Sequence, residues 1–439
     1  MIDHKKYNMM YKFPEIAVEE KHIVATYQVI IKTKDADKLA MAIADEQTTG
    51  TWIRVKYETE EKRAKFGGKV LSIYEIPPVD PGYVPDETCY ILQIGYPMTN
   101  FSQDISMLLT TVIGNISSSG KVKMIDLSFP EEWLKGFQGP KFGIDGIRDV
   151  LGVYDRPLTN CMIKPCISWT PDEGAELFYE AAVGGIDIVK DDELLSADMP
   201  YCPMAERIPK FMEMEKRAYE ETGEHTLYTV NITTDPAHLK ENAYRALELG
   251  ANAMMVNMYT VGLAATRMIT EDPNINVPIL GHVDFSGATA SSPYYGVAHH
   301  LWVGKLSRLA GVDMEIYGQP YGKFPSDQLA LTRGIHAFTQ DWYHIKPVLA
   351  LAGGGTIAPA VPYIMQLFGD DCCIAAGGGV HGHPMGSKAG AMSLRQAIDE
   401  TLKGVSLREY AQDHPELKAA CDVWGYGKEE LLKNYDLMN

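Results

Sequence analysis

The chain has 439 residues, of which 46% are hydrophobic and 22% charged, so it can bury the core of a large globular protein. Its 40 lysines and arginines stand against 58 aspartates and glutamates, which gives a formal net charge of −18. This charge argues against nucleic acid and anionic membranes as partners, and an anionic substrate must be met by locally placed lysines or a metal ion.

The N-terminal part, residues 1–138, is predicted to be an α+β domain with a ferredoxin-like fold. A strand pattern over residues 22–31 is followed by helical patterns over residues 36–45 and 105–113, with further strands between them. This order is typical of helices that cover one face of an antiparallel sheet. A glycine- and proline-rich joint over residues 136–143 marks the domain boundary.

Residues 139–406 are predicted to form a (β/α)8 TIM barrel. Short apolar strands alternate there with helix-length amphipathic segments, and eight such units in about 260 residues match the usual size of this fold. The predicted strands end near Lys164, Lys190, Asn231, Asn257, His282, Tyr317, Gly353 and Gly377. Residues 407–439 are predicted to be a charged helical extension that serves as a cap or an oligomer contact.

The compartment is predicted to be the cytoplasm. No apolar run reaches the length of a transmembrane helix, and residues 1–11 are polar, without the apolar core of a signal peptide. The cysteines number seven, an odd count, and form no Cys-x-x-Cys pair. This pattern indicates reduced thiols rather than a disulfide framework or a zinc site.

The run Lys190-Asp191-Asp192-Glu193 is the first candidate site. It follows the β-branched run of residues 186–189, which is typical of a buried parallel strand, and in a barrel such a strand ends on the catalytic face. Alternation places Lys190 and Asp192 on one side, and the following turn can bring Glu193 toward them. Such carboxylates form a hard-oxygen site of the kind that Mg²⁺ prefers. The alternative is a solvated strand-to-helix turn.

Two glycine clusters follow the last two predicted strands. They are Gly353-Gly354-Gly355 and Gly377-Gly378-Gly379. In a barrel the loops after strands seven and eight commonly hold a phosphate on backbone N–H groups, which residues without side chains allow to approach closely. Each cluster alone could be an ordinary turn, but two clusters in these two loops favour a phosphate site.

Three further residues are candidates for catalysis. Lys164 ends the first barrel strand, where a desolvated lysine can lose its proton near neutral pH and act as a base. Lys323 lies in a glycine-hinged loop and could fold over a bound anion. His282, at a strand end, could shuttle protons. The alternatives are solvated lysines and a structural histidine. The pair His381 and His383 is expected to pack structurally.

Motifs distributed over nearly the whole chain resemble the family of the ribulose-bisphosphate carboxylase (RuBisCO) large subunit and, within it, the RuBisCO-like proteins of form IV. The matching motifs are Glu46-Gln47-Thr48-Thr49-Gly50-Thr51-Trp52, Gly114-Asn115, Gly139-Pro140, Lys164-Pro165, Gly185-x-Asp187-x-x-Lys190-Asp191-Asp192-Glu193, Tyr321-Gly322-Lys323, Phe368-Gly369-Asp370-Asp371, Gly377-Gly378-Gly379 and Gly382-His383-Pro384-x-Gly386. The Lys-Asp-Asp-Glu signature after paired glycines is highly specific to this family.

The resemblance implies a metal site and an assembly. Lys190 would be carbamylated by CO₂ and would bind Mg²⁺ together with Asp192 and Glu193, because a carbamate turns the lysine into an oxygen ligand. The protein would be a homodimer with shared active sites, or a larger oligomer. The residues of one chain that would complete the neighbour's site are Glu46, Thr51, Trp52 and Asn115.

Several positions depart from the carboxylase pattern. Cys166 replaces the second lysine of a Lys-Pro-Lys motif. Val283 and Asp284 replace a catalytic histidine and a phosphate-binding arginine, and Ile316 and Gly353 replace a histidine and a serine that contact phosphate. The residues of the other phosphate pocket are retained, namely Thr51, Trp52, Lys323, Gly355, Gly377 and Gly378. These departures predict a substrate with one phosphate and disfavour carboxylation of ribulose bisphosphate.

The segment over residues 285–306 is similar to the 2,3-diketo-5-methylthiopentyl-1-phosphate enolases of methionine salvage. These enolases resemble one another in using an N-terminal-domain lysine as the base. This sequence has no lysine between Lys69 and Lys121, and its Asn115 is the carboxylase-like residue. Both observations count against that reaction.

The sequence therefore predicts a Mg²⁺-dependent enzyme that removes a proton next to a carbonyl of a monophosphorylated, sugar-like substrate. The reaction could end in isomerisation, as in an isomerase, or in decarboxylation, as in a lyase. Lys164 or carbamylated Lys190 would move the proton. One alternative is the methionine-salvage enolase. An alternative of another class is a non-catalytic, metal-binding or regulatory barrel.

Overall fold

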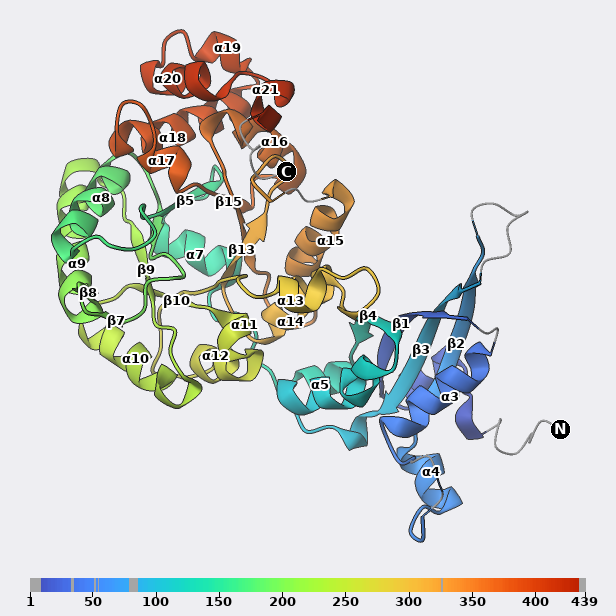
Figure 1. Cartoon of the computed structure of the whole chain (residues 1–439). Helices are drawn as coiled ribbons and strands as arrows, with labels where there is room; N and C mark the ends of the chain where they lie inside the picture. The colour runs from blue at the N-terminus through green and yellow to red at the C-terminus, as the bar shows by residue number, and fades with distance from the viewer. Residues whose placement is uncertain are drawn as a thin grey trace. The chain divides into compact units, whose positions relative to one another are not determined.

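The computed structural model describes residues 9–32, 35–50, 53, 55–78, 86–324 and 327–433. The chain divides into two units (Figure 1). The first comprises residues 1–137 and 285–302, and the second comprises residues 138–284 and 303–439.

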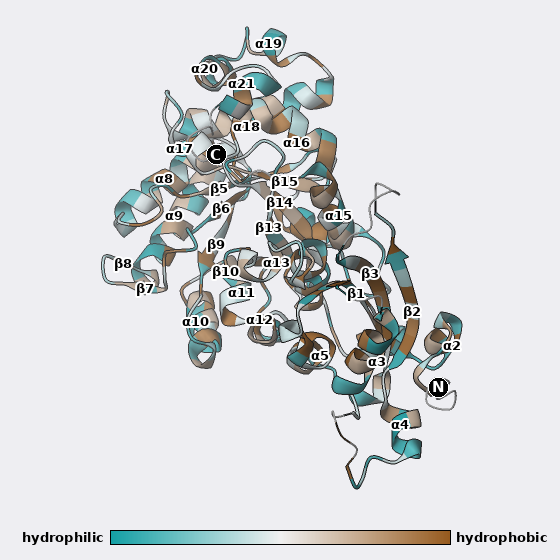
Figure 2. Cartoon of the chain, turned by 45° about the vertical axis from the view of Figure 1, so that its right-hand side comes forward, coloured by the Kyte–Doolittle hydropathy of each residue, from teal (hydrophilic) through white to brown (hydrophobic). Residues whose placement is uncertain are grey.

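A five-stranded sheet forms the first unit. Its order is β12-β4-β1-β3-β2. The bounds are β1 (His22–Ile31), β2 (Lys69–Ile76), β3 (Thr88–Pro97), β4 (Lys121–Ser128) and β12 (Gly296–Val297). Alternate residues of β1 and β3 are buried, as expected for a sheet with one covered face, and these strands are strongly apolar in Figure 2. The strand predicted over residues 22–31 is confirmed by β1.

Helices cover this sheet as predicted. The helices of the first unit are α2 (Pro14–Glu19), α3 (Ala36–Glu46), α4 (Glu60–Phe66), α5 (Ile105–Ile113), α6 (Glu131–Leu134) and α13 (Gly287–Ala290), with the 3₁₀ turns η1 (Met98–Asn100) and η2 (Asn115–Ser118). α3 packs against β2 and β3. The buried Tyr27 hydroxyl on β1 donates to the Val112 carbonyl of α5, so the sheet holds both long helices.

Strand β12 comes from a distant part of the sequence. It pairs in parallel with β4, Gly296 opposite Lys123, and the Lys123 ammonium donates to the Ala290 carbonyl at 3.3 Å. Gly296 has φ +77°, and a Cβ there would meet the Thr289 carbonyl oxygen at 2.1 Å, so the turn into β12 requires glycine. The sequence did not predict that residues 285–302 join this sheet.

The second unit is a closed parallel barrel. Its strand order is β10-β11-β13-β14-β15-β5-β6-β9. The bounds are β5 (Leu158–Met162), β6 (Ile188–Lys190), β9 (Leu227–Asn231), β10 (Ala253–Val256), β11 (Ile279–Gly281), β13 (Met314–Gly318), β14 (Leu349–Gly353) and β15 (Cys372–Ala375). All eight predicted strands are present, so the (β/α)8 barrel preceded by an α+β domain is confirmed.

Apolar side chains from all eight strands fill the barrel interior. They include Leu158, Ile188, Leu280 and Leu351, and helix α7 (Gly143–Leu151) contributes three more. The helices that follow are α8 (Pro171–Val183), α9 (Met204–Thr222), α10 (Pro236–Glu248), α11 (Met258–Val261), α12 (Leu263–Thr270), α14 (Leu306–Leu309), α15 (Gln328–Thr339), α16 (Val361–Phe368), α17 (Gly378–His381) and α18 (Ser387–Lys403). Shorter elements are the hairpin β7 (Asp198–Met199) and β8 (Cys202–Pro203), the kinked π-helical segment η3 (Leu301–Lys305) and the 3₁₀ turn η4 (Ala358–Ala360).

The C-terminal segment is helical and packs on α18. It contains α19 (Leu407–Tyr410), α20 (Pro415–Trp424) and α21 (Lys428–Lys433). The Gln396 amide donates to Glu416 at 2.8 Å, and His383 Nε2 bonds the Glu416 carbonyl at 3.0 Å. His383 therefore links the last barrel loop to these helices, a structural role.

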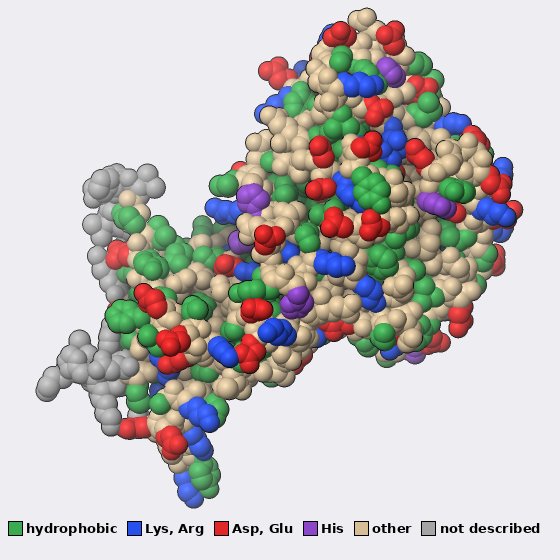
Figure 3. All heavy atoms as spheres, turned by 180° about the vertical axis from the view of Figure 1, so that it is seen from behind, with side chains coloured by type: hydrophobic (Ala, Val, Ile, Leu, Met, Phe, Trp, Pro, Cys, Tyr) green, Lys and Arg blue, Asp and Glu red, His purple; other side chains and the backbone are tan. Residues whose placement is uncertain are grey.

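Acidic and basic side chains are interspersed on the face shown in Figure 3, so the net negative charge is not gathered into one patch there. Among the helices of the described residues, none combines the length and the apolar character needed to cross a membrane.

A buried carboxyl group on β13 makes stability depend on pH. Glu315 is fully buried and accepts a hydrogen bond from the Tyr259 hydroxyl at 2.8 Å. Burial raises the pKa of Glu315 to about 8, although bonds from Ser307 and Tyr259 oppose the shift. Between about pH 4.5 and 8 the unfolded carboxyl ionises while the folded one stays protonated, so the free energy of unfolding falls as pH rises through this window.

We expect Glu315→Gln to remove most of this fall, which is on the order of a few kcal/mol, because the amide keeps the acceptor oxygen and does not ionise. Urea unfolding of both proteins at pH 5 and pH 8 measures the difference. Equal losses in the two proteins would show that Glu315 is ionised in the folded state.

Candidate active site

Strand β6 ends in the predicted metal site. Lys190 is its last residue, and Asp192 and Glu193 follow at the carboxyl end of the barrel. The side chains of Lys190 and Asp192 are buried, and the Lys190 ammonium lies 3.5 Å from Glu193 Oε2 and donates to the Asp191 carbonyl at 2.7 Å. The solvated-turn alternative is wrong for Lys190 and Asp192, because water does not reach them.

Burial also sets the charge states of this group. Burial lowers the pKa of Lys190, against the opposing effect of the charges on Glu193 and Asp192. Burial alone would raise the pKa of Glu193, but the positive charges of Lys190 and His282 lower it to about 2. The site therefore combines an amine that loses its proton more readily than usual with an ionised carboxylate.

This donor set fits a hard divalent cation. Asp192 and Glu193 supply carboxylate oxygens, and a carbamate on Lys190 would add a third oxygen. In the part of the chain that the structure describes, no three His, Cys, Asp or Glu side chains are grouped as a ready metal site.

Lys164 lies beside this group. Its ammonium donates to Asp192 Oδ2 at 2.7 Å and to Cys166 Sγ at 3.0 Å. Burial alone would lower the pKa of Lys164, but the bonds to Asp192 and Cys166 raise it above the ordinary value. Desolvation, which the sequence suggested as the activating effect, is thus outweighed while Asp192 holds the ammonium.

His282 follows β11, which is the third strand from β6 around the barrel, and its side chain reaches the group from there. Its Nε2 lies 3.3 Å from Glu193 Oε2, and its Nδ1 lies 3.1 Å from Asp284 Oδ1. From the sequence, Asp284 was considered only as the replacement of a phosphate-binding arginine. In the structure it also fixes the imidazole ring, so that His282 faces Glu193.

Asp191 is a residue whose role the sequence did not indicate. It is fully buried and accepts bonds from the Arg207 guanidinium at 2.9 Å, the Tyr228 hydroxyl at 2.6 Å and the Asn231 backbone N–H at 2.9 Å. Arg207 lies on the apolar face of α9, one residue before the buried Ile208. An arginine on the apolar face of a helix was the one feature of the sequence that could have indicated this buried ion pair.

Two asparagines hold the backbone of Glu193. Asn231, at the end of β9, and Asn257, after β10, donate from their side-chain amides to the Glu193 carbonyl at 3.2 Å and 3.0 Å. The sequence placed both at strand ends without assigning them a role. They fix the turn that carries the second carboxylate.

The two glycine loops lie next to Lys164 and Lys323. The Lys323 backbone N–H donates to the Gly354 carbonyl at 2.9 Å, which joins the loop after β13 to the loop after β14. A Cβ on Gly377 would lie 2.9 Å from Lys164 Cε, whereas a Cβ on Gly378 would meet no atom within 4 Å. Gly354 and Gly355 have φ +93° and +91°. Gly378 is thus exposed beside the lysine, whereas Gly377 is buried against it.

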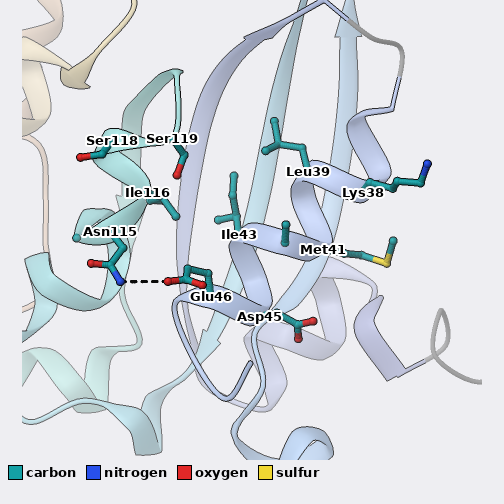
Figure 4. A pocket seen from close by; sticks show the side chains of 12 residues that line it. Lys38, Leu39, Met41, Ile43, Asp45, Glu46, Asn115, Ile116, Ser118 and Ser119 are labelled. Carbon is teal, nitrogen blue, oxygen red and sulfur yellow. Dashed lines mark hydrogen bonds between the residues drawn. The ribbon is translucent and has the colours of Figure 1, made fainter. Parts of the chain in front are cut away.

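Other predicted residues belong to the first unit. The Asn115 amide donates to Glu46 Oε1 at 3.1 Å, and both line a cavity of ≈ 790 Å³ between α3 and η2 (Figure 4). Gln47, next to Glu46, donates to the Thr111 carbonyl at 2.6 Å and so holds the end of α3 against α5. Thr51 and Trp52 lie outside the described residues.

The fold and the site together define a family. The N-terminal domain of the ribulose bisphosphate carboxylase large chain matches residues 10–133, and its catalytic domain matches residues 143–424. The protein belongs to the RuBisCO large-chain family. A ribulose bisphosphate carboxylase-like protein from Archaeoglobus fulgidus is 47% identical over 406 residues, which cover 91% of this chain and 92% of the relative. A 2,3-diketo-5-methylthiopentyl-1-phosphate enolase from Geobacillus thermodenitrificans is 39% identical over 412 residues, which cover 92% and 98%.

Solved structures agree with this placement. A RuBisCO-like protein from Alicyclobacillus acidocaldarius matches with a TM-score of 0.85 at 36% identity, covering 92% of this chain and 100% of its own. An octameric RuBisCO from Pyrococcus horikoshii matches with a TM-score of 0.86 at 32% identity, covering 93% and 95%. The resemblance to this family and to its RuBisCO-like members, inferred from the motifs, is confirmed.

Proposed function

We propose that the protein is a Mg²⁺-dependent enzyme of enolase or isomerase type. It removes a proton next to a carbonyl in a monophosphorylated, sugar-like substrate, and isomerisation or loss of a carboxylate completes the reaction. It does not fix CO₂. The observation that carries the proposal is the group of ion pairs at the end of β6, in which Lys164 bonds Asp192 and both the buried Lys190 and His282 lie beside Glu193.

Lys190, Asp192 and Glu193 would hold Mg²⁺, with CO₂ on Lys190 as a carbamate. The cation would supply Lewis-acid stabilisation of the negative charge that develops on the substrate oxygens. The lowered pKa of Lys190 supports this assignment, because the neutral amine is the form that adds CO₂. The bonds from Asn231 and Asn257 keep Glu193 in place for the same purpose.

Lys164 would move the proton. Its ammonium position, 2.7 Å from Asp192 Oδ2, places it at the edge of the metal group. The bond to Asp192 is one of the causes that raise the pKa of Lys164, so a ligand that occupies Asp192 favours the neutral amine that a base requires. His282, fixed by Asp284, would pass protons from the other side.

The single phosphate would lie on Gly354, Gly355, Gly377 and Gly378, with Lys323 folded over it. Backbone N–H groups and a lysine are the usual partners of a phosphate in such barrel loops. The residues Val283, Asp284, Ile316 and Gly353 offer no cation or histidine to a second phosphate. This loss separates the protein from a carboxylase that acts on a bisphosphate.

Gly378→Ala should weaken binding of inorganic phosphate at least about tenfold, because the new methyl group enters the space where the anion would lie. The fold should be unaffected, since that Cβ meets no atom within 4 Å. Gly427→Ala is the matched control, because its Cβ also meets nothing and it lies in the C-terminal segment. Titration calorimetry measures the affinity. Equal phosphate affinity in both variants would refute the assigned phosphate position.

The assembly would be a homodimer with shared sites, or a larger oligomer such as the octamer of the related RuBisCO. Asn115 and Glu46, which are bonded to each other beside an open cavity, would complete the neighbour's site with Thr51 and Trp52.

Proton exchange in D₂O tests the reaction. The protein is incubated with Mg²⁺, bicarbonate and a panel of pentulose monophosphates, and deuterium at the carbon next to the carbonyl is followed by NMR. Exchange with at least one member is the expected result. If no member exchanges, the proposal loses its support and the non-catalytic, metal-binding barrel becomes the better reading.

A second candidate is 2,3-diketo-5-methylthiopentyl-1-phosphate enolase, which is favoured by the 39% identity to the Geobacillus enolase. The N-terminal lysines that border the lysine-free stretch are engaged elsewhere. Lys69 is buried and donates to the Met9 carbonyl, and Lys121 pairs with Glu87. The next lysine, Lys123, donates to the carbonyls of Ala290, which ends α13, and Ser292. Adding the diketone phosphate to the same panel distinguishes the two candidates, because only the enolase consumes it.

A further inference from the structure

His381, the last residue of α17, bridges three elements next to the glycine loops. Its Nε2 lies 3.2 Å from Cys161 Sγ on β5, and its Nδ1 lies 3.1 Å from Ser387 Oγ, the first residue of α18. Its backbone N–H donates to the Gly377 carbonyl at 3.0 Å. In Figure 1, α17 lies beside α18. One imidazole thus joins the last barrel loop to the first barrel strand.

The bridge is made of neutral groups. Burial, followed by the charge of Lys164, lowers the pKa of His381 to about 4. Burial raises the pKa of the Cys161 thiol far above its ordinary range. A neutral imidazole has one N–H donor and one acceptor nitrogen, which matches its two partners, a thiol and a hydroxyl. The contacts are therefore directional hydrogen bonds and do not depend on ionisation at neutral pH.

The bridge controls the spacing between two functional elements. β5 leads directly into Lys164, and the backbone of Gly377 packs against the Lys164 side chain, since a Cβ there would lie 2.9 Å from Lys164 Cε and 3.1 Å from the Met162 carbonyl oxygen. A shift of the glycine turn relative to β5 would therefore move the phosphate-binding N–H groups relative to the lysine.

We propose that His381 is a positioning residue that fixes the turn over residues 377–379 against β5 and so sets the place of the bound phosphate relative to Lys164. The inference rests on the proposed phosphate site. The hydrogen bonds of His381 run to Cys161, Ser387 and the Gly377 carbonyl, so its effect passes through the turn. A leucine would fill the same space but would make neither bond.

His381→Leu should weaken the binding of inorganic phosphate about tenfold, as expected for the loss of a bond that orders the turn. His381→Gln retains an amide near Nε2, so it can bond Cys161 and should restore most of the affinity. His381→Asn retains only the contact toward Ser387 and should not. This pattern separates positioning from bulk packing. Both amides are polar and so resemble histidine more than leucine does, yet only one of them can bond Cys161.

Cys161→Ala removes the other partner of the same bond. It tests the inference independently if His381→Leu fails to fold. It should weaken phosphate binding by a similar factor, and the double variant with His381→Leu should show no further loss. Once a substrate is identified, KM should rise more than kcat falls. Wild-type affinity in both single variants would overturn the inference.

The outcome also separates this inference from the function on which it rests. If the wild-type protein binds phosphate and Gly378→Ala prevents it while His381→Leu and Cys161→Ala do not, the phosphate site stands and the inference falls. If the wild-type protein binds no phosphate, both fall.

Discussion

Lys190→Met should abolish Mg²⁺-dependent proton exchange, with a loss of about a thousandfold or more, because removal of the amine removes both the carbamate and one ligand of the cation. Methionine approximates the volume of the lysine stem, so the buried strand end should remain filled. NMR exchange in D₂O measures the rate, and ¹³C-labelled CO₂ gives a carbamate resonance that the variant should lack.

The matched control is Lys210→Met, which removes a solvent-exposed lysine of α9 whose partner is Asp172. Its exchange rate and its carbamate signal should equal those of the wild-type protein. Preincubation with bicarbonate should raise the wild-type rate and leave Lys190→Met unchanged. A variant that still exchanges in the presence of Mg²⁺ would remove Lys190 from the metal site.

Arg207→Met should destabilise the protein by about 3–5 kcal/mol, because it leaves the fully buried Asp191 charge without its cation. The Tyr228 hydroxyl and the Asn231 N–H would still bond the carboxylate but would not neutralise it. The free energy of unfolding from urea titration measures the effect.

Arg245→Met is the control for this measurement. Arg245 makes an ion pair of similar length, 2.8 Å, with Asp198, but both side chains are exposed. Its loss should cost less than about 1 kcal/mol. Asp191→Asn combined with Arg207→Met should recover part of the loss, since no unpaired charge then remains. Similar losses in the two arginine variants would contradict a special role for burial.

The fold was predictable because its elements follow the local pattern of the sequence. Eight apolar strands alternating with amphipathic helices leave little choice of architecture, and parallel strands end on one face, so the motif at Lys190 had to lie at the barrel rim. Strand β12 was not predictable. Two residues have no periodicity, and their pairing with β4 is decided by contacts far apart in sequence.

The candidate site was predictable only in part. The Lys-Asp-Asp-Glu run located the carboxylates, but the supporting contacts join residues whose types are common on surfaces. Arg207 and Asp191 are sixteen positions apart, and an arginine on a helix usually faces solvent. The His282 to Asp284 contact spans two residues and depends on how the chain turns after β11, which no spacing rule gives.

The return of the chain at β12 has a consequence for the order in which the protein is made. The strand that pairs with β4 is synthesised only after five of the eight barrel strands have been completed. During synthesis the N-terminal sheet therefore has an edge, at β4, that awaits its partner. The first unit can begin to fold early, but its sheet is completed late, together with the barrel.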